Sequence, residues 1–83
     1  MGKAKGVEVN PKIMFGKPII AGTRIPVEII LEKLAIGEAV EDILQDYPRL
    51  TKDDIHAAIS FANKLVKKVS IEDVQATSYK ISP

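Results

Sequence analysis

The chain of 83 residues contains no cysteine and only one histidine, His56. Without cysteine it forms no disulfide and no thiolate metal site, and a single histidine excludes the usual histidine-cluster metal sites. A domain this small buries only about 60% of the surface that its unfolded chain exposes. Small domains are often reinforced by disulfides, metals or a second subunit. We therefore expect a homodimer and no cofactor.

The chain also lacks any apolar run near the ~20 residues that a membrane-spanning helix needs. Its first ten residues, MGKAKGVEVN, carry two lysines but no apolar segment behind them, so we expect no signal peptide. The absence of cysteine fits a reducing compartment. These features favour a cytoplasmic protein with no membrane partner.

The charges are segregated along the chain, although they nearly cancel to a formal net charge of +1. Residues 1–25 carry five basic side chains against one acid, whereas residues 26–58 carry eight acids against three basic side chains. Residues 59–69 carry three lysines and no acid. Such segregation bears on steering and partners rather than on the fold.

Three segments have the apolar spacing of helices. The first, about 26–36, begins at a proline and ends before Gly37, which suits the left-handed position after a helix. The second, about 38–46, ends before Pro48. The third, about 52–69, follows Thr51, with Asp54 placed to complete a capping box. The third helix also has a long apolar stripe, made of Ile55, Ala58, Ile59, Ala62, Val66 and Val69.

Upstream of the helices, residues about 12–25 predict a small β ribbon. Its short strands would be Ile13–Phe15, Pro18–Ile20 and Thr23–Ile25, separated by two turns. A ribbon of this size does not stand alone, so we expect it to pack on the helices or to pair with another chain. The predicted organisation is an N-terminal arm (1–11), a mainly helical domain (12–69) and a C-terminal tail (70–83).

The stretch GKPIIAGTRIP, residues 16–26, looks like a phosphate-binding loop at first sight. A P-loop requires Gly-Lys-Ser/Thr after its spacer, whereas Gly22 is followed directly by Thr23 and Lys17 lies at the wrong end. The next helix also begins at Pro26, which has no N–H to offer an anion. We interpret the stretch as a structural connection into the first helix.

Within that connection, Ile19 and Ile20 are expected to anchor the ribbon. Arg24 has two possible roles: it pairs with acids of the first two helices, such as Glu28, or it faces a partner.

We expect no enzymatic activity and no small-molecule substrate. The hydroxyls of Thr51, Ser60 and Ser70 have no evident base beside them. The neighbouring acids Asp53 and Asp54 do not face each other on a helix, so they form no acid–base pair.

The short turn between the second and third helices matches a helix-turn-helix outline. In that motif the start of the recognition helix reaches base edges, yet here Asp53 and Asp54 would repel phosphates. Basic residues of the N-terminal segment are better candidates for contacts with operator DNA. They are Lys3, Lys5, Lys12, Lys17 and Arg24.

Candidates for protein binding lie on the first helix and in the tail. The first helix has more apolar surface than a small core hides. The apolar residues of the tail have no helical period, which is typical of an element that folds on a partner or packs back on its own domain. The candidates are Arg24, Ile29, Ile36, Ile71, Val74, Tyr79 and Ile81.

The pieces GKP (16–18), GTRIPV (22–27) and YPRLT (47–51) occur in order, and an alanine-rich helix follows them. With them, residues about 12–62 resemble the DUF433 family of small prokaryotic proteins. A departure is Phe15 before Gly16, where members often have a second glycine. The resemblance implies a homeodomain-like, helix-turn-helix fold with a small N-terminal β element. It also implies an antitoxin role, often beside a PIN-like nuclease toxin, and brings no catalytic or ligand residues.

We therefore predict a non-enzymatic, antitoxin-like protein that neutralises a nuclease toxin through its first helix or tail and binds operator DNA. One alternative is a stand-alone DNA-binding regulator, whose binding would weaken steeply with salt. The other is a dimeric adaptor for protein interactions.

Overall fold

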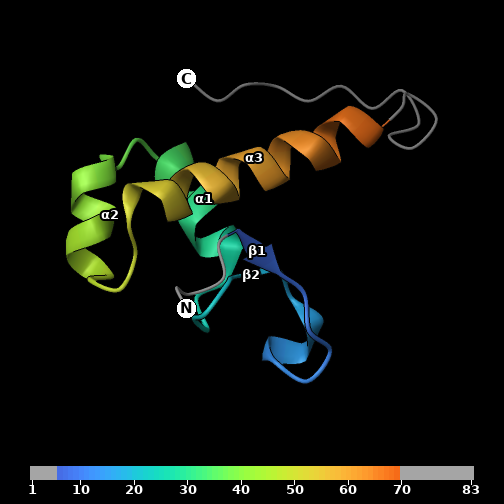
Figure 1. The fold of residues 1–83 in the computed structure, drawn as a ribbon. Helices are drawn as coiled ribbons and strands as arrows, with labels where there is room; N and C mark the ends of the chain where they lie inside the picture. Colours follow the sequence, from blue (N-terminus) through green and yellow to red (C-terminus); the bar gives the residue numbers. More distant parts are fainter. Residues whose placement is uncertain (1–5, 70–83) are drawn as a thin grey trace.

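A computed structural model of the chain describes residues 6–69. In chain order they form a strand β1 (Val7–Glu8), a single turn η1 (Met14–Gly16), a strand β2 (Ile19–Ile20) and three helices. The helices are α1 (Val27–Ala35), α2 (Val40–Asp46) and α3 (Lys52–Lys68). Helix α3 contacts both other helices and both strands, and the small sheet lies at the N-terminal side of this arrangement (Figure 1). The expected mainly helical fold with a small N-terminal β element is confirmed.

Strand β2 lies at the centre of the N-terminal part. It pairs with β1 in antiparallel fashion, with Val7 opposite Ile20 and Glu8 opposite Ile19. On its other edge, Ile19 forms a single bridge with Pro26. Both isoleucines of β2 are completely buried, which explains why this two-residue strand holds the ribbon to the helices.

Two of the strand predictions are wrong. Residues 13–15 form no strand, because Met14 and Phe15 adopt left-handed φ angles of 51° and 58° that reverse the chain in η1. Residues 23–25 form no strand either, because Thr23 lies in a tight turn. Its hydroxyl donates to the carbonyl of Ile20 (2.7 Å) and accepts from the N–H of Ile25 (3.0 Å).

The strand that pairs with β2 lies instead at residues 7–8, inside the segment predicted to be a separate arm. Val7 packs against the core, and the N–H of Ala21 donates to the carbonyl of Gly6 over 2.9 Å. The domain therefore begins before residue 12.

The ends of α1 and α2 follow local signals. Pro26 is the N-cap of α1, one residue before the helix begins, and Gly37 adopts a φ of 90° after its end. The N–H groups of Gly37 and Glu38 then donate to the last carbonyls of α1. Helix α2 begins two residues later than expected, because Ala39 is extended, with a ψ of 149°.

Helix α3 begins with the predicted capping box. The N–H of Asp54 donates to the hydroxyl of Thr51 over 3.2 Å, and the N–H of Thr51 donates to the Asp54 carboxylate over 3.0 Å. Asp54 is buried in this arrangement, whereas Asp53 is exposed.

The core reaches only the first half of α3. It consists of Ile20, Val27, Ile30, Ile43, Leu50, Ile55 and Ala58, with Phe61 and other half-buried side chains packed against it. The apolar stripe of α3 is therefore buried only as far as Ala58, and 67% of Val66 is exposed. Figure 1 shows the reason: the end of α3 projects beyond α1 and α2.

Candidate interaction surface

The basic residues predicted to contact DNA differ in their surroundings. Lys3 and Lys5 lie outside the described residues, and Lys12 and Arg24 are exposed. The Lys17 ammonium lies 2.7 Å from the Glu28 carboxylate. This hydrogen bond and the charge of Glu28 raise the pKa of Lys17 above its usual 10.5.

Glu28 thus pairs with Lys17, and not with Arg24 as one prediction had it. Arg24 is exposed and makes no hydrogen bond or ion pair with any group in residues 6–69. The predicted pairing of Arg24 with Glu28 is therefore wrong, and its role at a partner surface stays a prediction.

The residues predicted to bind a protein partner are only partly described. Ile29 is half-buried on α1, whereas Ile36 is 79% exposed immediately after the helix. Ile71, Val74, Tyr79 and Ile81 lie outside the described residues. Of the two isoleucines of this set within residues 6–69, Ile36 is the more exposed.

A lysine at the contact between α1 and α2 has a structural role. The Lys33 ammonium lies 3.4 Å from the carboxylates of both Glu38 and Asp46, and 5.9 Å from the centre of the Tyr47 ring. Burial lowers the pKa of Lys33, but hydrogen bonds and charges from Asp46 and Glu38 together outweigh burial and raise it above 10.5. This side chain joins two helices and is not available to a ligand.

The first apolar surface that the sequence did not reveal is the turn η1. Phe15 is 99% exposed at its tip, and Met14 beside it is also exposed. Both residues and Gly16 have positive φ angles, which reverse the chain at this point. One sequence signal pointed to this surface: Phe15 stands where members of the DUF433 family often have a glycine.

A second exposed apolar surface runs from the middle of α3 to its end; the sequence indicated its apolar stripe but not that these side chains are exposed. Ile59 and Val66 are seven residues apart, so they lie on one face of the helix, and Val69 follows on the same side. We call these three residues the α3 apolar flank. The same half of the helix carries three exposed lysines, Lys64, Lys67 and Lys68. This combination makes the end of α3 both apolar and basic.

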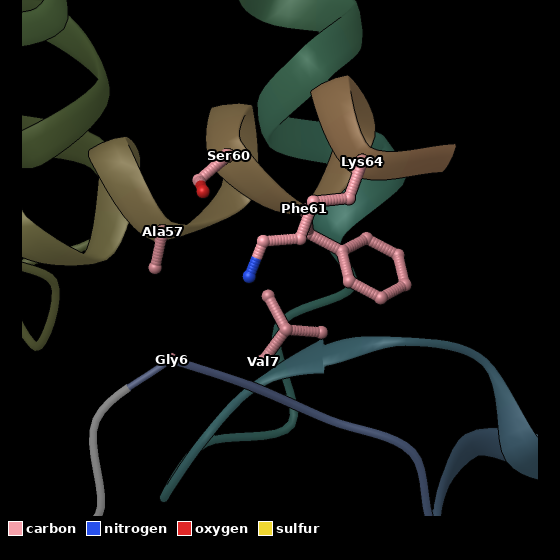
Figure 2. A pocket seen from close by; sticks show the side chains of 6 residues that line it. All are labelled: Gly6, Val7, Ala57, Ser60, Phe61 and Lys64. Atoms are coloured by element: carbon pink, nitrogen blue, oxygen red, sulfur yellow. The ribbon is translucent and has the colours of Figure 1, made fainter. Parts of the chain in front are cut away.

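Two pockets lie beside α3, and Phe61 lines both of them. The first, of about 230 Å³, lies between β1 and α3 (Figure 2). In it Val7 points up towards the helix, and the Lys64 side chain reaches into the space from above. Its polar lining consists of one hydroxyl (Ser60), one ammonium and backbone, which gives it a cationic and apolar character.

The second pocket, of about 310 Å³, lies where α1 begins. Its walls are mostly apolar, and the Lys17–Glu28 pair borders it. The apolar lining consists of Pro18, Val27, Phe61 and Leu65. We call this space the Leu65 pocket; sequence reasoning missed it, although Phe61 and Leu65 have the spacing of helical neighbours.

In residues 6–69 no group of three or more histidines or carboxylates is placed to hold a metal ion. None of the helices there combines the length and the hydropathy that crossing a bilayer requires.

The fold and surfaces define a small, mainly helical domain with an N-terminal two-stranded sheet and uncovered apolar side chains. Residues 7–62 match the family described as Protein of unknown function (DUF433), and the chain belongs to this family. The match includes β1, which agrees with the corrected start of the domain. It ends at residue 62, so Lys64, Lys67, Lys68 and Leu65 of α3 lie beyond it.

One relative is the uncharacterized protein y4eO of Sinorhizobium fredii, which is 36% identical over 56 residues. The match covers 68% of this chain but only 25% of the relative, so the domain there is part of a much longer protein. A solved structure of a DUF433 member from Anabaena variabilis is also similar, with a TM-score of 0.70 and 26% identity. That likeness covers 84% of this chain and 69% of the other.

Proposed function

We propose that this protein is a non-enzymatic, antitoxin-like binding protein that neutralises a nuclease toxin in the cytoplasm. The observation that supports the proposal best is the end of α3, where the α3 apolar flank and three lysines are exposed on one projecting helix. An amphipathic helix of this kind fits a hydrophobic groove on a partner protein. The proposal therefore moves the toxin contact from α1 and the tail to the end of α3.

The positive charge at the end of α3 indicates that the partner's binding surface is acidic. Residues 59–69 carry three basic side chains and no acid. A nuclease that uses divalent metal ions holds them with carboxylates, and its catalytic cleft is acidic before the metal binds. The α3 lysines are complementary to such a cleft, and the apolar flank would supply the buried contact area.

Co-expression with the neighbouring reading frame tests the proposal. We expect that frame to be toxic alone and harmless when this protein is present. The double variant Ile59→Asp/Val66→Asp should lose the rescue, because it places two carboxylates on the α3 apolar flank. Ile36→Asp is the control, since it places a carboxylate on an isoleucine that is even more exposed but lies at the end of α1.

Circular dichroism would check that both variants remain helical. The proposal fails if the neighbouring frame is harmless alone, if its toxicity persists with the wild-type protein, or if the folded double variant rescues as well as Ile36→Asp does.

A second candidate is a DNA-binding regulator with a helix-turn-helix arrangement of α2 and α3. The exposed Lys12 and Arg24 and the lysines of α3 favour it, because phosphate contacts supply most non-specific affinity. The exposed Asp53 at the start of α3 argues against docking by that end. A gel shift with the promoter of its own gene, repeated at rising salt, tests it; no shift at low salt would remove this candidate.

A further inference from the structure

The turn η1 is conformationally costly. Met14, Phe15 and Gly16 have consecutive φ angles of 51°, 58° and 80°. The left-handed region disfavours any residue with a Cβ atom, and only glycine enters it readily. Phe15 is 99% exposed, so its side chain gains no packing that would offset this conformation. Strained backbone of this kind clusters at active sites, ligand clamps and switch regions.

The Leu65 pocket lies close to this turn along the chain. Its wall residue Pro18 is only three positions from Phe15, so their Cα atoms are at most about 11 Å apart. Phe15 does not occupy the pocket of its own chain, because its ring is almost fully exposed. One molecule therefore carries an apolar ring and an apolar pocket as near neighbours.

We propose that the occupant of the Leu65 pocket is Phe15 of a second copy of this chain. A two-fold axis beside Pro18 would place each Phe15 in the pocket of the other chain. Such an interface is isologous and closed, since the same surface serves both partners. The proposal is independent of the antitoxin role, which concerns the α3 apolar flank.

The size of the contact fits a second copy. A phenylalanine buries roughly 150–250 Å², so two reciprocal rings would cover about a quarter of a standard interface of ~1,600 Å². Further apolar surface is available beside the turn and pocket, from the exposed Val9 and Met14 and the half-exposed Leu65.

Charge and composition favour a second copy as well. The ion pair at the rim, Lys17 with Glu28, carries no net charge, so two pockets can face each other without strong repulsion. The chain has no cysteine, and its described part has no metal cluster, which leaves association as the means of reinforcing a small core.

Light scattering during size-exclusion chromatography gives the first test. The wild-type chain should have twice the mass of one 9.1 kDa chain at high micromolar concentration. Phe15→Gly should be a folded monomer, because glycine adopts the left-handed conformation without strain. Losing two central anchors should weaken dimerisation by roughly 1,000-fold, about 30-fold for each. The control Ile36→Ser should remain a dimer.

Mixing two variants gives the second test. Leu65→Trp should fill the pocket and also yield a monomer, while its Phe15 remains intact. Mixed with Phe15→Gly, whose pocket is open, it should form a heterodimer held by one ring in one pocket. The proposal is overturned if the wild type is a monomer, if Phe15→Gly remains a dimer, or if the two variants do not associate more strongly together than either does alone.

Discussion

Replacing Thr23 with valine tests whether the turn before α1 depends on a hydroxyl group or on shape. The hydroxyl accepts from the N–H of Ile25 and donates to the carbonyl of Ile20, and Thr23 is only 9% exposed. Valine has nearly the same shape as threonine, so the substitution removes both hydrogen bonds while it keeps the packing.

The two lost bonds are not equivalent. The carbonyl of Ile20 still accepts from the N–H of Thr23 over 3.0 Å. The N–H of Ile25 has no other acceptor within residues 6–69, and Ile25 is half-buried. An unpaired donor in such a place costs about 2 kcal/mol. For a domain of this size, that lowers Tm by roughly 8–16 °C.

Thr23→Ser is the matched control. Serine keeps both hydrogen bonds and loses one methyl group, which costs about 1 kcal/mol. In urea unfolding followed by circular dichroism, Thr23→Val should therefore have a lower free energy of unfolding than Thr23→Ser. If Thr23→Val is as stable as Thr23→Ser or more stable, the reasoning is refuted, and the turn depends on shape alone.

Three further predictions concern the core, the cap and the ion pairs. Ile55→Ala should destabilise the protein by about 2–5 kcal/mol, because Ile55 is fully buried; a thermal melt within 2 °C or so of wild type would contradict this. Thr51→Ala should lose about 1 kcal/mol in urea unfolding through the broken capping box, and no change would contradict it. The raised pKa values of Lys17 and Lys33 mean that their pairs stabilise the fold below pH 10.5 and stop doing so as the pH rises through the raised values. As the pH is raised past 10.5, Tm should therefore fall less for Lys33→Met than for the wild type, because the variant has no Lys33 ion pairs to lose.

The helices could be predicted because their signals are local. Gly37 after α1 and the Thr51–Asp54 capping box act within a few residues of where they stand, so sequence reveals them directly. The sheet could not be predicted in the same way. Its two strands have two residues each, too few for periodicity, and β1 pairs with a strand more than ten residues away.

The candidate surfaces were harder to predict than the fold. Sequence places Val66 on an apolar stripe, but periodicity does not say where the neighbouring elements end. Nothing local predicts that Met14 and Phe15 adopt a conformation that both residues disfavour. The partner of Glu28 likewise depends on how β2 approaches α1, which brings Lys17 and not Arg24 within reach.

Helix α3 begins inside the core and ends outside it, so its backbone amides have very different protection. We expect amides near Ile55 and Ala58 to exchange with solvent only when the whole domain opens, and those near Val66 to exchange by fraying of the last turns. One helix therefore contains both an internal standard of global stability and a sensitive reporter. Any molecule that covers the end of α3 will slow exchange there while the standard stays constant, so hydrogen exchange locates the contact without labelling either partner.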